Sequence, residues 1–255
     1  MASEGFRFKQ FYVRHDRCAM KVGTDGVLLG AWAPTPYPLH PTPFTFHLST
    51  LNFLDIGTGS GLIALMLAQR CPSAHIDAID IDEAAVEQAR ENFENSAFSL
   101  QLSAFQSSLQ EWQIGNEQSS MSNKKYSLIV SNPPYFQNSL KNPDPGRKAA
   151  RHTDSLSLEE LITHSVRLLA ENGVLALILP AEAEEEMRAI ASAAGLQLMR
   201  VTRVYSKESK PARRVLMAFT FHLSPFTFLE DRLILEDEKG GRSAAYSKLC
   251  EEFYL

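Results

Sequence analysis

The sequence has few cysteines and no apolar run long enough to span a membrane. Its three cysteines, Cys18, Cys71 and Cys250, are odd in number and far apart along 255 residues. Such a set argues against a disulfide framework or a zinc site and fits reduced thiols in a cytosolic protein. The apolar residues 173–181 have only the length of a buried strand, and the first ten residues lack the apolar segment of a secretory signal. We therefore expect a cytoplasmic protein that makes no membrane contact.

A large excess of charge is also missing. The net charge is −5, with 22% charged and 44% hydrophobic residues, which is ordinary for a globular protein and argues against non-specific coating of nucleic acid. Positive charge is nevertheless concentrated in residues 137–152 and 200–214, and each cluster is either a solvated loop or a phosphate-binding surface. The basic residues of the two clusters are Lys141, Arg147, Lys148, Arg151, Arg200, Arg203, Lys207, Lys210, Arg213 and Arg214. No histidine has the spacing of a metal site, so we predict no metal ion.

Strand and helix patterns alternate from Asn52 onward. The expected strands cover residues 52–57, 75–82, 99–106, 126–131, 173–180, 196–205 and 215–222. The expected helices cover residues 60–70, 83–96, 157–173, 181–195 and 243–253. This alternation predicts an α/β fold, with a doubly wound, mostly parallel, seven-stranded sheet that has helices on both faces.

We expect residues 1–50 to form a short N-terminal extension and residues 51–255 to form the main domain. The extension has a strand pattern at residues 6–13 and then a helix pattern that Thr24 or Asp25 could cap. Residues 34–49 hold five prolines and are expected to form a loop. The polar residues 115–125 are expected to form a flexible excursion.

A glycine-rich loop, LDIGTGSGL at residues 54–62, joins the first expected strand of the main domain to its helix. Gly57, Gly59 and Gly61 let the backbone turn tightly and approach a ligand, at the strand ends where open α/β sheets bind ligands. A dinucleotide fingerprint requires a glycine at the sixth position from Gly57, where this chain has Leu62, and a Walker lysine is absent.

Two acids flank this loop. Asp55 would repel a pyrophosphate, but it could organise a ligand that carries an ammonium group. Asp80 ends the next strand and could accept both hydroxyls of a ribose. Asp82 and Glu83 are better placed than Asp80 to cap the following helix.

The stretch SNPPYF, at residues 131–136, follows the fourth expected strand. Proline has no backbone N–H, fixes φ, and restricts the residue before it, so Asn132 and Pro133 are stiff and extended. One interpretation is a strand terminator with a surface aromatic. The other is a rigid rim that directs the Asn132 amide, the Pro133 carbonyl and the Tyr135 ring at a small planar ligand.

Together, LDIGTGSG, the acid after the second strand and NPPY resemble the class I S-adenosylmethionine methyltransferases that methylate amino nitrogens, which have a Rossmann-like fold. This resemblance covers residues 51–179. The segments FKQFYVRHDRCAMKVGTDGVLLGAWA, ARRVLMAF and YSKLCEEFYL resemble the bacterial family that methylates the exocyclic N6 amine of an adenine beside the anticodon of valine tRNA. With them the resemblance extends over nearly the whole chain.

The resemblance implies S-adenosylmethionine as cofactor and S-adenosylhomocysteine as product. The implied cofactor-binding residues are Asp55, Gly57, Thr58, Gly59, Gly61, Asp80, Ile81, Ser108, Asn132 and Thr24. Ser108 stands where relatives often place an acid for the cofactor adenine, so backbone groups and Ile81, with help from Leu109, are expected to hold that ring. Lys21, Thr24, Asp25 and Gly26 form either a lid over the methionine end or simply an N-terminal helix packed on the sheet.

For the target amine, the implied catalytic residues are Asn132, Pro133, Pro134 and Tyr135. The Asn132 side-chain oxygen and the Pro133 carbonyl would accept its two N–H bonds, which favours a more nucleophilic nitrogen, and the two prolines would keep both acceptors still. Tyr135 would stack on the base, and Phe136 either helps or fills the core. The expected RNA-binding residues are Lys141, Arg147, Lys148, Arg151, Lys210, Arg213 and Arg214.

Three alternatives remain open from the sequence. The same NPPY chemistry serves enzymes that methylate a glutamine amide of peptide release factors, but those carry a larger helical domain in front. A DNA adenine methyltransferase would need a target-recognition segment that is not evident. A non-catalytic RNA-binding module would not need an intact NPPY motif. We therefore expect tRNA as the partner, with no obligate protein partner.

Overall fold

The computed structural model describes residues 4–35, 51–112, 125–133, 156–222 and 228–255. Its strands form a two-stranded hairpin and one eight-stranded sheet. The hairpin strands are β1 (Gly5–Arg7) and β2 (Tyr12–Arg14). The sheet strands are β3 (Leu51–Ile56), β4 (Ala74–Asp80), β5 (Leu102–Gln106), β6 (Tyr126–Ser131), β7 (Leu169–Pro180), β8 (Gln197–Tyr205), β9 (Ala212–Thr220) and β10 (Leu229–Ile234).

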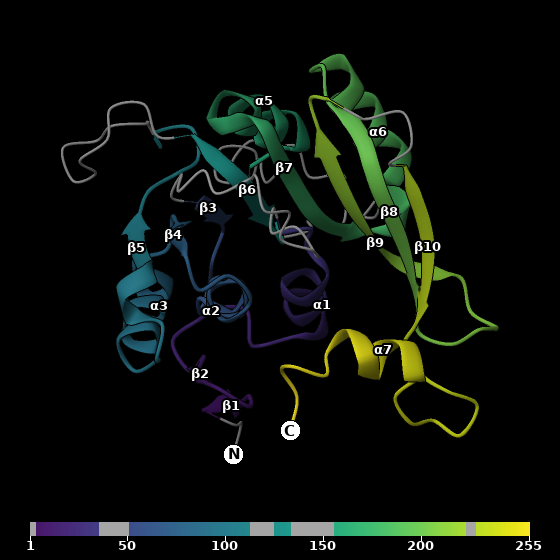
Figure 1. The fold of residues 1–255 in the computed structure, drawn as a ribbon, viewed down its shortest axis with the longest axis horizontal. Coiled ribbons are helices and arrows are strands. Elements are labelled where there is room, and N and C mark those ends of the chain that lie inside the picture. Colours follow the sequence, from purple (N-terminus) through teal and green to yellow (C-terminus); the bar gives the residue numbers. More distant parts are fainter. Residues whose placement is uncertain (1–3, 36–50, 113–124, 134–155, 223–227) are drawn as a thin grey trace, which may run out of the picture.

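The sheet strands lie in the order β10-β8-β9-β7-β6-β3-β4-β5 (Figure 1). Neighbouring strands are parallel, except that β9 is antiparallel to both β7 and β8. The central strands are nearly continuous apolar runs because both faces of the sheet are covered, and residues 175–179 of β7 have no exposed surface. These observations confirm the predicted α/β fold with a mostly parallel sheet.

Helices cover both faces of this sheet. On one face lie α1 (Thr24–Trp32), α2 (Leu62–Arg70), α3 (Glu83–Glu94) and α7 (Ala244–Leu249), and on the other lie α5 (Leu158–Leu168) and α6 (Glu184–Ala193) (Figure 1). The core is divided accordingly: Leu65 and Phe93 belong to one buried cluster, and Leu161 and Met187 to another. Within the described part of the chain, no helix is long and apolar enough to cross a membrane.

The sequence predicts seven strands, and the structure has an eighth, β10, which pairs with β8 at the edge of the sheet. Its sequence LEDRLI holds three charged residues, and four of its six residues are exposed. An exposed edge strand needs no continuous apolar run, and charged side chains protect it from unwanted pairing. The apolar runs that predict the buried strands therefore give no signal here.

The boundary between α5 and β7 also differs from the prediction. The helix ends at Leu168 instead of residue 173, and β7 already begins at Leu169, which pairs with Tyr126. The next pair is Leu128 with Val174, so a bulge removes residues 170–173 from the ladder. A side chain at Gly173 would lie 2.8 Å from the carbonyl oxygen of Tyr126, so this glycine allows a close backbone approach instead of ending a helix.

Helix α1 begins without a side-chain cap. Its N-cap is Gly23, so the prediction that Thr24 or Asp25 would cap it is wrong. The Asp25 carboxylate instead accepts a hydrogen bond from Nε of Arg214 at 2.7 Å, and this contact joins α1 to the start of β9. Most of the proline-rich segment 34–49 and of the polar segment 115–125 lies outside the described residues.

Candidate active site

The chain reverses its direction of travel across the sheet at β3. From β3 it passes to β4 and β5 on one side, and then it returns to β6 on the other. Ligands of open α/β sheets bind at such a point, beyond the carboxyl ends of the strands. The glycine loop leaves β3 there and Asn132 leaves β6. Ile56 is paired with Ser131, whose hydroxyl donates to the Ile56 carbonyl at 2.9 Å, so the two segments start side by side.

All three glycines of the loop have positive φ angles, of +70° at Gly57, +55° at Gly59 and +79° at Gly61. A side chain at Gly57 or Gly59 would meet nothing within 4 Å, whereas a side chain at Gly61 would overlap the ring of Phe93. Gly57 and Gly59 therefore leave open space for a ligand. Gly61 instead lets the loop pack closely on α3.

Several backbone amides of this loop already have acceptors. Those of Gly57 and Thr58 donate to the Ile79 carbonyl at 2.9 and 3.0 Å, and that of Gly61 donates to the Thr58 carbonyl at 3.0 Å. The Gly59 amide donates to the Asp80 carboxylate at 2.9 Å. A phosphate-binding loop would direct such amides at its ligand. In this loop those amides bond to protein acceptors instead, in agreement with its lack of a dinucleotide fingerprint.

Asp55 lies beneath the loop and has no exposed surface. Its Oδ2 accepts from the Thr58 hydroxyl at 2.7 Å and from the Ala64 amide at 3.2 Å, while its Oδ1 has no hydrogen-bond partner among the described residues. Burial raises the pKa of this carboxyl to about 7, the bonds from Thr58 and Ala64 oppose that change, and the charge of Asp80 adds to it. A cation at Oδ1 would favour the ionised form.

Asp80 is half-buried at the end of β4. One carboxylate oxygen accepts from Gly59 and the other from the Asp82 amide at 3.0 Å. A carboxylate oxygen can accept more than one hydrogen bond, so both atoms keep capacity for ligand hydroxyls. As predicted, Asp82 and not Asp80 caps α3, because its side chain accepts from the Ala84 amide at 3.0 Å.

The residues expected near the cofactor adenine have different surroundings. Ile81 follows Asp80 and is 61% exposed, which offers an apolar surface beside the acid. The Ser108 hydroxyl donates to the Glu111 carboxylate at 3.1 Å and accepts from the Glu111 backbone amide at 3.2 Å. Leu109 is buried in the core and presents no side chain at the surface. Of these residues, only Ile81 offers a large exposed apolar side chain.

Of the NPPY motif, the structure describes Asn132, which is half-buried, and Pro133, which is buried. Several of the other predicted residues lie outside the described part of the chain, and their roles stay predictions. They are Pro134, Tyr135, Phe136, Lys141, Arg147, Lys148 and Arg151.

The second basic cluster lies at the same edge of the sheet as the glycine loop. Strand β8 is parallel to β10 and antiparallel to β9, and Pro180 at the end of β7 pairs with Arg214 at the start of β9. The turn between β8 and β9 therefore lies at the edge where the parallel strands have their carboxyl ends. Strand β9 is two strands away from β6, which Asn132 follows. Lys210 and Arg213 are exposed there, and neither makes an ion pair within the described residues.

Most of the positive charge in this cluster is compensated by acids from elsewhere in the chain. Arg203 pairs with Glu184 at 2.7 Å, and Arg214 pairs with Asp25 at the same distance. The remaining pairs are Arg200 with Asp231 at 3.3 Å and Lys207 with Glu236 at 3.3 Å. The basic surface is therefore smaller than the count along the sequence indicates, and it is centred on Lys210 and Arg213.

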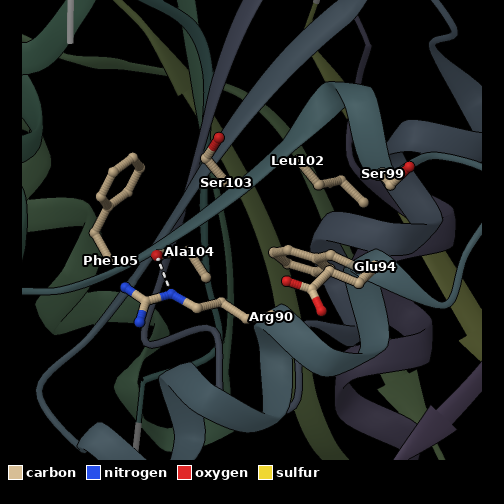
Figure 2. Close-up of a pocket in the computed structure, with 8 residues that line it drawn as sticks. Arg90, Glu94, Ser99, Leu102, Ser103, Ala104 and Phe105 are labelled. Carbon is tan, nitrogen blue, oxygen red and sulfur yellow. Dashed lines mark hydrogen bonds between the residues drawn. The ribbon is translucent and has the colours of Figure 1, made fainter. Parts of the chain in front are cut away.

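A surface depression of about 450 Å³ lies between α3 and β5 (Figure 2). Arg90 crosses it, and its Nε donates to the Ala104 carbonyl at 2.9 Å (Figure 2). None of the predicted site residues lines this depression. Because its location differs from that of the strand ends, we do not assign it to the same site.

Two buried polar residues of α3 were missed by the sequence prediction, and one of them contacts the site. Gln88 and Asn92 are almost fully buried, and Asn92 donates to the Ser60 carbonyl in the glycine loop at 2.8 Å. The available signal was their spacing, because amides four residues apart lie on one face of a helix. That face also carries the buried Ala89 and Phe93.

Residues 44–195 match the methyltransferase small domain family. The chain belongs to this family. Relatives that align with the methyltransferase over its whole length carry the name tRNA1(Val) (adenine(37)-N6)-methyltransferase. One from Bacteroides fragilis and one from Parabacteroides distasonis are each 44% identical to it over 256 residues, which covers 100% of this chain and 99% of each relative.

Solved structures agree with the methyltransferase at the level of the fold. A protein from Agrobacterium tumefaciens, described as a predicted O-methyltransferase, aligns with a TM-score of 0.65. The alignment covers 90% of this methyltransferase and 96% of that chain, at 17% sequence identity. At this identity the likeness supports the shared fold alone.

Proposed function

We propose that this methyltransferase transfers a methyl group from S-adenosylmethionine to the N6 amine of an adenine in the anticodon loop of a tRNA. The observation that carries the proposal is the meeting of an acid-flanked glycine loop with Asn132 and Pro133 at the reversal point of the sheet. The full-length relatives named for position 37 of a valine tRNA indicate which tRNA to test first. A tRNA substrate also supports a cytoplasmic location.

The residues present fit this cofactor better than a phosphate-bearing one. Asp80 would hold the ribose hydroxyls, Ile81 would pack on the adenine, and the Oδ1 of Asp55, which has no hydrogen-bond partner among the described residues, would favour an ammonium group nearby. Gly57 and Gly59 leave room for close approach. When bound, S-adenosylmethionine supplies a methyl group that is already activated by a sulfonium.

The contribution of Asn132 is to orient the target amine. Its side-chain oxygen and the Pro133 carbonyl would accept the two N–H bonds, so the nitrogen lone pair is directed at the methyl group. Both acceptors follow β6, which is paired with β3 and β7, and they are further fixed by the bond from Ser131 to Ile56. Because such groups need little reorganisation, their effect on the rate is large.

The strand order separates the two reactants. The cofactor residues follow β3 and β4 on one side of Asn132, and the exposed Lys210 and Arg213 lie beyond β7 on the other. The RNA backbone would therefore lie over β7 and β9. A base in an anticodon loop is already partly unstacked, so moving it to Asn132 costs less than in a duplex.

Mass spectrometry of nucleosides tests this proposal directly. Total tRNA incubated with the enzyme and S-adenosylmethionine should gain N6-methyladenosine. Asn132→Ala should slow single-turnover transfer by about a hundredfold or more, while calorimetry shows nearly unchanged cofactor affinity. An absence of N6-methyladenosine in every tRNA, together with methylation of a release-factor glutamine, would overturn the RNA assignment.

A further inference from the structure

The side chain of Asn92 on α3 joins two segments that are far apart in the sequence. Its Nδ2 donates to the carbonyls of Arg14 and Ser60, both at 2.8 Å, and its Oδ1 accepts from the Arg14 amide at 2.9 Å. The residue is 2% exposed. One buried amide therefore makes three hydrogen bonds, two to the N-terminal segment and one to the glycine loop.

In the glycine loop, Asn92 fixes the orientation of the Ser60 carbonyl, which the backbone alone would leave variable. Ser60 lies between Gly59 and Gly61, which both have positive φ angles, so its carbonyl could point in many directions without a partner. Gly61 packs against Phe93, the residue that follows Asn92. Helix α3 thus supports the loop through one hydrogen bond and one close contact.

On the other side, Asn92 holds a segment that we call the strap, residues 14–22. Gln88, one turn earlier on α3, accepts from the Arg17 amide at 3.2 Å. The strap folds back on itself, because the Lys21 amine donates to the His15 carbonyl at 2.9 Å and the Val22 amide donates to Nδ1 of His15 at 3.2 Å.

The strap passes close to the acid that would hold the ribose. Cys18 in its middle is buried, and burial together with the charges of Asp80 and Asp82 raises the pKa of its thiol to about 11. The hydrogen bonds give the same placement: Arg14 bonds to Asn92 and Arg17 to Gln88, so the strap runs along α3 toward its first turn, which begins just after β4. The strap is thus a neighbour of the cofactor residues, although it lies 58–66 residues before Asp80 in sequence.

We propose that Asn92 is a positioning residue for the cofactor site, which holds the strap and the glycine loop together so that the strap forms a wall beside Asp80. This inference rests on the proposed function, since it assumes that the loop binds S-adenosylmethionine. An amide is suited to the task because it donates twice and accepts once. A carboxylate at this position would face two carbonyl oxygens with no hydrogen to donate.

The test compares Asn92→Asp with Asn95→Asp, the same change at an exposed amide at the end of α3 whose side chain bonds, among the described residues, only to the Glu91 carbonyl. Asn92→Asp should raise KM for S-adenosylmethionine and Kd for S-adenosylhomocysteine by about tenfold or more. It should leave kcat at saturating cofactor and the affinity for tRNA within about twofold, because the change lies on the cofactor side. Asn95→Asp should match the parent in all four quantities.

Hydrogen exchange on the unaltered protein provides a second test that does not depend on how the variant folds. S-adenosylhomocysteine should slow exchange in peptides that cover residues 14–22 as well as in those that cover residues 57–64. Protection of the loop alone, or an unchanged KM and Kd in Asn92→Asp, would overturn the role of Asn92 and leave the proposed function intact. No binding of S-adenosylhomocysteine to the parent protein would overturn both.

Discussion

At the scale of single residues, the three glycines of the loop have two different roles. All three need a left-handed backbone, but only Gly61 is packed against another side chain, the ring of Phe93. Gly57 and Gly59 face open space. The same residue type thus leaves open space at two positions and allows helix packing at the third.

This difference predicts that two alanine substitutions lower the stability by different amounts. Gly61→Ala should lower the free energy of unfolding by more than about 2 kcal/mol, because backbone strain adds to an overlap with Phe93. Gly57→Ala should lower it by only about 1–2 kcal/mol and should mainly weaken the binding of S-adenosylhomocysteine. Urea denaturation and calorimetry of both variants measure these effects. Equal losses of stability would contradict the assignment of Gly61 to packing.

The buried carboxyl of Asp55 makes the stability of the protein depend on pH. Burial raises its pKa from 3.8 to about 7, so between these values the unfolded chain is ionised at Asp55 while the folded protein keeps the proton. The stability that this proton provides is complete below about pH 4 and is lost as the pH rises through about 7.

Asp55→Asn removes this titration and serves as the reference. Urea denaturation at about pH 5 and about pH 8 should show that the parent loses free energy of unfolding relative to Asp55→Asn as the pH rises. An identical pH dependence of the two proteins would exclude Asp55 as the cause.

Residue roles were predictable from the sequence only where the signal is local. The helix cap at Asp82 and the glycine loop follow from the residues themselves and their neighbours. The contacts of Asn92 with Arg14 and Ser60 join positions 78 and 32 residues away, and no local pattern indicates such a partner. For the same reason, the pairing of Arg214 with Asp25 was missed.

At the scale of elements, apolar periodicity predicted the buried strands and helices well and their ends poorly. Strand β7 was predicted because its apolar run is buried on both faces, but its first residues pair irregularly, so Leu169 was assigned to the preceding helix. Strand β10 was missed because it is exposed. The failures thus occur at an exposed edge strand and at an irregularly paired strand end, where apolar runs do not mark the boundaries.

The turn between β8 and β9 supports a prediction about RNA binding. Lys210→Glu together with Arg213→Glu should weaken tRNA binding and reduce its salt dependence, because both side chains are exposed at the carboxyl edge. The affinity for S-adenosylhomocysteine should not change. Fluorescence anisotropy with labelled tRNA at several salt concentrations measures the effect.

Lys125→Glu is the matched control for the single charge reversal Lys210→Glu, since both change the net charge equally. Lys125 is also exposed, but it directly precedes β6 and lies at the opposite edge of the sheet. Its reversal should leave the affinity for tRNA nearly unchanged. A similar loss in the control and in the turn variant would show that overall charge, and not the turn, governs binding.

At the scale of the whole molecule, the two ends of the chain meet. Phe8 and Phe253 belong to the buried cluster that also contains residues of α1, α2, α3 and α7. The Lys9 backbone amide donates to the Phe253 carbonyl at 2.9 Å. Tyr254 stacks on Phe8 with ring centroids 6.0 Å apart. The described N-terminal residues therefore share a core with the main sheet.

The C-terminal end should thus be required for stability. Phe253→Ala should lower the free energy of unfolding by about 3–5 kcal/mol, as expected for a large side chain that is 2% exposed. Leu255→Ala, two residues later at a side chain that is 83% exposed, should change it by less than about 0.5 kcal/mol. Urea denaturation compares them, and similar values for both would show that the contact between the ends is dispensable.

The position of Asn132 between β3 and β7 also has a kinetic consequence. The residues assigned to the cofactor follow β3 and β4, and the basic turn lies beyond β7, so under the proposed function we expect the two reactants to approach from different sides. We then expect cofactor and tRNA to bind in either order. We also expect S-adenosylhomocysteine to leave while the nucleic acid is still bound, so that release of one product does not have to wait for release of the other.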